Sequence, residues 1–164
     1  MRYDLRKHNF YVAIFICLLI LLLDRISKNM ILKLNEGTSI PIIKNIFHIT
    51  FIYNTGAGFG VFQNASIFLT IFSVVILIGA IYYFFKTKGM TLRIMISVLI
   101  AGIVGNLTDR MLYGKVIDFV DLRIWPVFNI ADVAITLGIL SIIVYLWIND
   151  KKTNSKGRKN LSSS

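Results

Sequence analysis

The sequence predicts an all-α membrane protein with four transmembrane helices and a small external β-sheet, a cradle, on the outer membrane face. Three observations support this fold class. Of the 164 residues, 56% are hydrophobic and 16% are charged, and the mean hydropathy is +0.73. Soluble domains are nearer to 25% charged. Four apolar segments approach the roughly 20 residues that a helix needs to cross a bilayer. The basic residues form clusters that all lie on one side of the membrane if the chain crosses it four times.

The predicted helices follow the apolar segments in order along the chain. The first segment is short, and we expect it to continue as helix through Leu32. The second carries no charge, and the fourth carries only Asp132. The third is the least apolar because Arg93 lies near one end and several polar residues lie near the other. The four segments are Phe10–Leu23, Ser66–Phe85, Thr91–Met111 and Phe128–Ile148.

Three basic clusters predict the topology. They precede the first span, separate the second from the third, and follow the fourth. The excess of Lys and Arg marks the cytoplasmic side, so we expect both termini to be cytoplasmic. Residues 1–150 then form one intramembrane domain, and residues 151–164 form a basic, disordered cytoplasmic tail. The net charge of +10 could indicate nucleic acid. No RNA-binding motif accompanies the tail, so no nucleic-acid partner is expected. The clusters are Arg2, Arg6 and Lys7; Lys86, Lys88 and Arg93; and Lys151, Lys152, Lys156, Arg158 and Lys159.

Two external segments, 36–64 and 114–128, separate the spans on the outer side. Asn45–Asn54 is rich in β-branched and aromatic residues, which favour strands. The second segment also alternates in places. We therefore expect two short extended pieces that form a small sheet on the outer membrane face.

Polar residues gather in the outer half of the predicted spans and at the outer surface. A charge at membrane depth costs about 2.5–3.5 kcal/mol on insertion scales, so such residues are usually functional. Many of them in one layer indicate a polar cavity rather than an isolated structural ion pair. They are Asp24, Arg25, Lys28, Asn54, Asn106, Asp109, Arg110, Asp118, Asn129 and Asp132.

The residue types in this layer favour carboxylate chemistry. The two histidines are His8, on the cytoplasmic side, and His48, in a predicted strand, so neither is placed to activate a serine. The single cysteine, Cys17, lies in an apolar run, and H-E-x-x-H is absent, so no disulfide, metal site or cofactor is expected. Two nearby carboxyl groups can share one proton and hydrolyse a peptide bond as base and acid.

Asp118 and Asp132 are the best placed carboxyl pair. One follows the third span and the other lies just inside the fourth, so a chain reversal can bring them together. Asp121 is a rival, but alternation along a strand turns it to another face. Asp109 is adjacent to Arg110, and we interpret it as a paired structural charge.

Five segments, taken in order, resemble the lipoprotein signal peptidase (signal peptidase II) family. Each motif alone is weak, but together they span most of the chain. Two positions depart from the common pattern: Ala101, where glycine is frequent, and Gly58, where alanine is frequent. The segments are D-R-x-x-K at 24–28, N-T-G-A-G-F-G at 54–60, A-G-x-x-G-N-x-x-D-R at 101–110, V-x-D-F at 116–119 and F-N-x-A-D at 128–132.

The resemblance implies an aspartic endopeptidase of the plasma membrane, active at its outer face as a monomer among membrane lipids. It would remove the signal peptide of a prolipoprotein by cutting just before a diacylglyceryl-modified cysteine. The external sheet would clamp the extended substrate by strand addition. Asp118 and Asp132 would be catalytic. The residues implied to bind substrate or support the site are Asp24, Lys28, Asn54, Gly56, Asn106, Asp109, Arg110 and Asn129.

Two alternatives from other functional classes remain open at the level of the sequence. A small transporter could use Asp24 or Asp132 as its coupling carboxylate, which predicts polar residues near the bilayer midplane. A membrane scaffold could use the external sheet to bind partners, in which case neither aspartate would matter for function.

Overall fold

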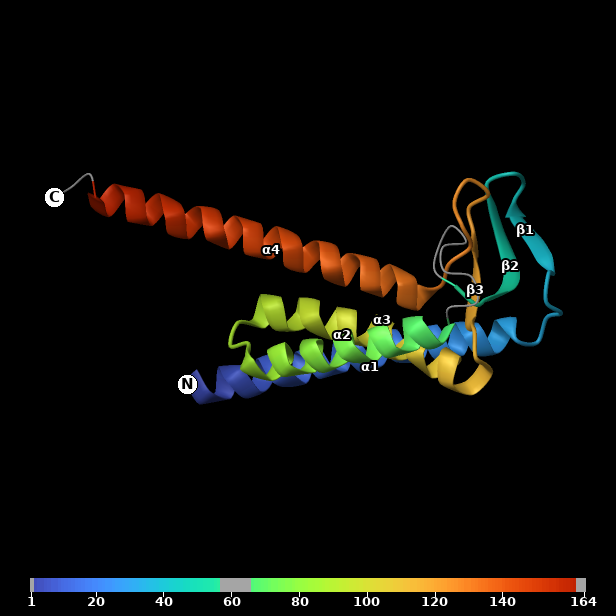
Figure 1. Ribbon diagram of the computed structural model, residues 1–164, viewed down its shortest axis with the longest axis horizontal. Helices are drawn as coiled ribbons and strands as arrows, with labels where there is room; N and C mark the ends of the chain where they lie inside the picture. The colour runs from blue at the N-terminus through green and yellow to red at the C-terminus, as the bar shows by residue number, and fades with distance from the viewer. Residues whose placement is uncertain (1, 57–65, 162–164) are drawn as a thin grey trace.

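The computed structural model describes residues 2–56 and 66–161, and within these ranges it contains four long helices and three strands (Figure 1). Each helix is long and apolar enough to cross a membrane. The predicted four-span fold with a small sheet is therefore confirmed. The helices are α1 (Arg2–Ile31), α2 (Ser66–Lys86), α3 (Met90–Tyr113) and α4 (Ile130–Leu161), and the strands are β1 (Ser39–Ile43), β2 (Phe47–Asn54) and β3 (Val116–Asp121).

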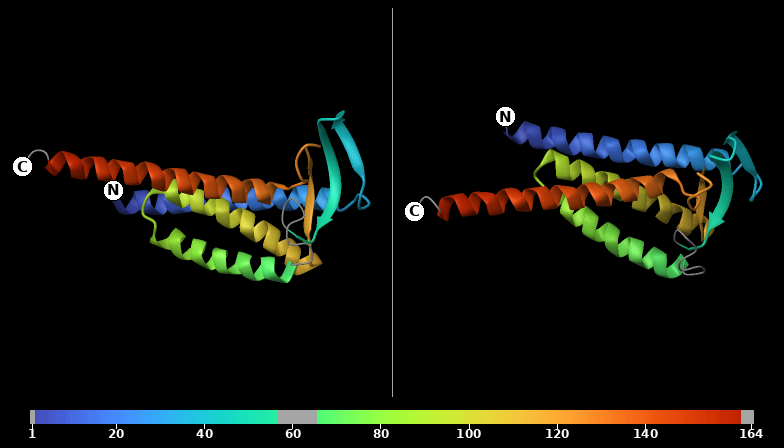
Figure 2. Two further views of the ribbon diagram at one scale, coloured as in Figure 1. Left: turned by 45° about the horizontal axis from the view of Figure 1, so that its top comes forward. Right: turned by 90° about the horizontal axis from the view of Figure 1, so that it is seen from above.

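The helices run lengthwise, with both termini at one end of the bundle and the sheet at the other (Figures 1 and 2). The connection between α2 and α3 lies at the end that holds the termini. All three basic clusters of the sequence therefore belong to the end away from the sheet. The long axis of the protein separates a basic end from a sheet end.

The sheet is antiparallel, with the order β1-β2-β3. Its central strand, β2, lies within the run predicted as a strand, and β3 lies within the second external segment. A register shift between Ile49 and Ile52 marks a bulge in the pairing of β2 with β3. Strand β1 was not predicted from the sequence, because all five of its residues are exposed and it contains Pro41. Proline is tolerated at a sheet edge, and a fully exposed strand shows no alternation.

The tail after Asp150 is helical rather than disordered as far as Leu161, because α4 continues through it without a break. The expectation of an irregular tail is therefore wrong for residues 151–161. Helix formation is costly only at its first turn. Because the span is already helical, the polar residues that follow can extend the helix without a new nucleation step.

Helices α3 and α4 approach each other closely where α3 carries glycine. A Cβ atom added to Gly102 would lie 2.5 Å from the carbonyl oxygen of Ala131, and one added to Gly105 would lie 3.0 Å from the Cβ of Ala131. Only a residue without a side chain fits such a distance. This approach brings the polar end of α3 against the first turn of α4.

Candidate active site

Asp132 is fixed in the first turn of α4 by a reciprocal pair of hydrogen bonds with Asn129. The backbone N–H of Asp132 donates to Asn129 Oδ1 (2.9 Å), and the backbone N–H of Asn129 donates to Asp132 Oδ2 (3.1 Å). This is the capping-box arrangement, which satisfies two N–H groups that a helix start leaves unpaired. It holds the Asp132 carboxylate at the sheet end of the span.

Asp118 lies on β3 and is buried, with 2% of its surface exposed. Two side-chain amides hold its carboxyl group. Asn54 Nδ2 donates to Oδ2 (2.8 Å), and Asn129 Nδ2 donates to Oδ1 (2.6 Å). The N–H of Gly56 donates to Asn54 Oδ1 (2.9 Å), which turns the Asn54 amide nitrogen toward Asp118. Asn129 thus contacts both aspartates, one through its side chain and the other through the helix cap.

Asn106 on α3 links the aspartate pair to a buried lysine. Its Nδ2 donates to Asp132 Oδ1 (2.6 Å), and its Oδ1 accepts from Lys28 Nζ (3.1 Å) and from Asn129 Nδ2 (3.1 Å). An ammonium group can only donate, so Lys28 requires the amide oxygen of Asn106 on its side. The amide nitrogen must then face Asp132.

A buried ion cluster lies behind this layer. Lys28 Nζ lies 2.9 Å from Asp24 Oδ2 and 2.7 Å from Asp109 Oδ2, and all three side chains are at most 1% exposed. Arg25 Nη1 lies 3.0 Å from Asp109 Oδ1. Asp109 is a paired structural charge, as predicted, but its partners come from α1 rather than from Arg110. The cluster ties α1 to α3.

The same carboxylates also order backbone groups near the aspartate pair. Asp24 Oδ1 accepts from the backbone N–H of Ala131 in the first turn of α4 (3.0 Å). Asp109 Oδ2 accepts from the backbone N–H of Ile117 on β3 (3.3 Å). The ion cluster therefore positions the two elements that carry Asp118 and Asp132.

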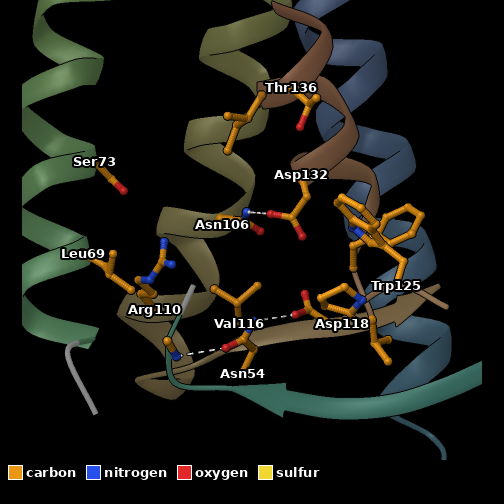
Figure 3. A pocket seen from close by; sticks show the side chains of 15 residues that line it. Asn54, Leu69, Ser73, Asn106, Arg110, Val116, Asp118, Trp125, Asp132 and Thr136 are labelled. Atoms are coloured by element: carbon orange, nitrogen blue, oxygen red, sulfur yellow. Dashed lines mark hydrogen bonds between the residues drawn. The ribbon is translucent and has the colours of Figure 1, made fainter. Parts of the chain in front are cut away.

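Asp118 and Asp132 line one cavity of about 420 Å³ (Figure 3). Walls from β2, β3, α2, α3, α4 and the segment 125–128 surround it. In Figure 3, Arg110, Leu69 and Ser73 lie on one side of Asp132, and Trp125 lies on the other. The remaining lining residues are Asn54, Gly56, Asn106, Val116, Pro126, Val127, Phe128, Ile135 and Thr136.

The two aspartates of β3 differ in their electrostatic surroundings. Burial, reinforced by the negative charge of Asp132, raises the pKa of Asp118 to about 7, although hydrogen bonds from Asn54 and Asn129 oppose the shift. For Asp121, burial is outweighed by hydrogen bonds from Thr50 and Arg123, and its pKa stays below the ordinary value. Asp118 can thus hold a proton near neutral pH, whereas Asp121 stays ionised.

The structure brings all ten predicted site residues into one connected site. Six of them line the cavity: Asn54, Gly56, Asn106, Arg110, Asp118 and Asp132. The other four hold those residues or their elements in place: Asp24, Lys28, Asp109 and Asn129. Part of the 54–60 motif, residues 57–60, lies outside the described residues.

The sequence placed Arg25 in the polar layer without a role of its own, and in the structure it pairs with Asp109. Several residues of the cavity wall were not predicted at all. Ser73 and Thr136 line the cavity. Their hydroxyl groups stand out within apolar spans and are the signal in the sequence that could have identified them. Trp125 follows no periodic pattern, so nothing in the sequence pointed to it.

Comparison with known proteins gives one consistent result. The family described as "Signal peptidase (SPase) II" matches residues 16–148. The lipoprotein signal peptidase of Halothermothrix orenii is 38% identical over 83% of this chain and 95% of its own length. That of Staphylococcus haemolyticus is 35% identical over 92% of this chain and 98% of its own length.

Solved structures agree with the sequence matches. One described as a bacterial membrane enzyme, determined by the in meso method at 2.3 Å resolution, superimposes with a TM-score of 0.81 and 33% identity. The match covers 86% of this chain and 90% of that chain. A second such structure, at 1.9 Å resolution, gives a TM-score of 0.74 and 34% identity over 82% of this chain and 92% of that one. Because the sequence matches extend over most of each chain and the folds superimpose, this chain belongs to the signal peptidase II family.

Proposed function

We propose that this protein is an intramembrane aspartic endopeptidase that removes the signal peptide of prolipoproteins just before a diacylglyceryl-modified cysteine. The observation that carries the proposal is the placement of Asp118 and Asp132 in the wall of one cavity, each oriented by amide donors. Family membership supplies the substrate class, since the relatives are lipoprotein signal peptidases.

The pair would hydrolyse the peptide bond with one shared proton. The ionised carboxylate takes a proton from water as the water oxygen attacks the carbonyl carbon, and the protonated carboxyl donates its proton to the carbonyl oxygen. The C–N bond then breaks as the nitrogen takes the proton from the first carboxyl. A hydroxyl of the intermediate returns a proton to the second, so the pair regains its starting state. The pKa of Asp118, raised to about 7, supports a pair that keeps one proton near neutral pH.

Strand addition to β3 is not favoured as the way the substrate reaches the pair. The outer edge of β3 already bonds to other parts of the chain: Ile117 donates its N–H to Asp109 and accepts from Asn129. The N–H of Phe119 donates to the carbonyl oxygen of Phe128 (3.0 Å). The other edge strand of the described sheet is β1, two strands away from Asp118. We infer that the substrate reaches the pair through the cavity.

We further propose that the sheet end faces the outside of the plasma membrane and that the protein acts as a monomer in contact with lipid. The positive-inside rule supports this orientation, since the basic clusters all lie at the opposite end. The scissile bond of a lipid-modified cysteine would then lie at the headgroup level, where the cavity lies.

The test is cleavage of a synthetic, diacylglyceryl-modified prolipoprotein peptide by the purified protein. Asp118→Asn and Asp132→Asn should each reduce cleavage by at least about 10³-fold, with the double variant little worse, because groups that act as a unit are not additive. Asp121→Asn is the matched control and should keep most of the activity. Activity should survive chelators. Near-normal turnover of either single variant would refute the assignment.

A further inference from the structure

A second, smaller cavity adjoins the first at Asp132. It has a volume of about 240 Å³, and we call it the α4-side cavity; it is lined by Trp125, Phe128, Asp132, Val133, Thr136 and Leu137. Four of these residues, including Asp132, also line the main cavity. Apart from Asp132 and Thr136, its lining side chains are apolar or aromatic. Asp132 therefore lies between the main cavity and the mainly apolar α4-side cavity.

The α4-side cavity continues into an apolar stripe along α4. The stripe consists of Val133, Leu137, Leu140, Val144 and Trp147, which recur every three or four residues and so lie on one face of the helix. Their side chains are 41–59% exposed, although the helix is a membrane span. Exposed apolar side chains on a span face lipid. The cavity is thus continuous with a lipid-facing surface that ends beside Asp132.

The main cavity offers different groups on its other side. Arg110 and Ser73 lie toward α2, on the side of Asp132 opposite Trp125 (Figure 3). Together with Asn54 these side chains can donate hydrogen bonds to the carbonyl groups of an extended peptide. An acyl chain in that part would lie against a guanidinium group, which is unfavourable because the charge would lose hydration.

We propose that the α4-side cavity is the subsite for an acyl chain of the substrate's diacylglyceryl group, which enters from the bilayer along the α4 stripe. The peptide on either side of the scissile bond then occupies the main cavity. This inference rests on the proposed function and adds to it the route of the lipid. It makes Leu137, with Trp125 and Val133, a determinant of specificity for the lipid rather than for the peptide.

The experiment compares two synthetic prolipoprotein peptides that differ only in the acyl groups, dipalmitoyl or dihexanoyl. Leu137→Trp places a larger side chain in the α4-side cavity. It should raise KM for the dipalmitoyl peptide by about 5–10-fold, with KM for the dihexanoyl peptide changed less than about twofold. Leu146→Trp, an equally exposed position on α4 outside the cavity, is the matched control and should behave as the wild type with both peptides.

The possible results separate this inference from the proposed function. An equal rise of KM for both peptides by Leu137→Trp would assign the cavity to the peptide and overturn the inference, as would no change for either. Failure of the wild type to cleave either peptide would overturn the proposed function as well. As a second measurement, a diazirine at the end of the acyl chain should crosslink to residues 125–137. Crosslinks to α2 at residues 69–73 instead would contradict the proposed route.

Discussion

At the scale of single residues, the two aspartates are held by groups that serve them both. Asn129 caps α4 through Asp132 and donates its amide to Asp118, so neither carboxyl group can turn without disturbing the other. Burial of the Asp118 carboxyl group raises its pKa, although the hydrogen bond from Asn129 opposes the shift. The folded protein keeps a proton that the unfolded chain would release, and stability therefore depends on pH.

We expect Asp118→Asn to stabilise the protein increasingly as pH rises. The folded pKa is about 7 against an ordinary value of 3.8, so the free energy of unfolding of the wild type falls between these pH values as pH rises. An amide does not ionise and avoids this loss. Thermal unfolding in detergent should show the advantage of Asp118→Asn growing by about 2 kcal/mol from pH 5 to pH 8.

Asp121→Asn should show the opposite sign and serves as the control. Its carboxylate has a lowered pKa, so it contributes stability above its unfolded pKa that is lost as pH falls. Replacing it should destabilise the protein at neutral pH and matter less in acid. An advantage of Asp118→Asn that is equal at pH 5 and pH 8 would show that the Asp118 carboxyl is not shifted.

Lys28→Met should be strongly destabilising. Without the ammonium, Asp24 and Asp109 lose a partner at 2.9 Å and 2.7 Å in a fully buried place. Removing one partner of a buried pair costs about 3–5 kcal/mol, because the remaining charge is uncompensated. Thermal unfolding measures the loss, and Lys33→Met, at an exposed position of the next turn, should change little. Equal melting temperatures for Lys28→Met and the wild type would show that the cluster does not hold α1 in place.

At the scale of elements, the contact between α3 and α4 decides whether the polar groups meet. We expect Gly105→Ala to reduce cleavage at least about 10-fold and to cost about 1–3 kcal/mol, since the added Cβ would lie 2.8 Å from Asp24 Oδ2 and 3.0 Å from the Ala131 Cβ. Gly79→Ala in α2 is the control, because nothing lies within 4 Å of its added Cβ. It should be neutral or stabilising by up to about 1 kcal/mol, as alanine favours helix. Full activity of Gly105→Ala would mean that the two helices can separate without harm.

The elements themselves could largely be predicted, whereas several partners could not. Apolar runs mark the spans because the bilayer requires about 20 residues of helix. The pairing of Asp109 could not be predicted from its neighbour Arg110, because adjacent residues on a helix point in different directions. Its partners, Arg25 and Lys28, lie on another helix, and only the packing of α1 against α3 brings them near. Likewise β1 leaves no periodic signal, because no face of it is buried.

At the scale of the whole molecule, the charged groups of the spans are unevenly distributed along the bundle. The site residues Asp24, Asp109 and Asp132 lie within about two turns of the sheet end of their helices. A transporter that couples ion movement to a carboxylate would place it near the bilayer midplane. A peptidase acting on a lipid-anchored substrate instead needs its carboxylates at headgroup depth. The arrangement favours the peptidase.

The distribution of basic residues predicts how the protein is oriented in the membrane. The basic clusters at the end that holds the termini predict that this end is cytoplasmic and the sheet end external. The single native cysteine, Cys17, can be removed as Cys17→Ala. Lys44→Cys, in the β1–β2 turn, and Lys88→Cys, between α2 and α3, then give two exposed thiols at opposite ends.

In intact cells a membrane-impermeant maleimide should label Lys44→Cys and leave Lys88→Cys unlabelled until the membrane is opened. Reporter fusions should agree, with cytoplasmic signals at residue 88 and at the C-terminus and external signals near residues 40 and 115. Labelling of Lys88→Cys in intact cells would reverse the orientation. Asp118 and Asp132 would then face the cytoplasm, where a lipid-modified cysteine of the outer leaflet could not reach them.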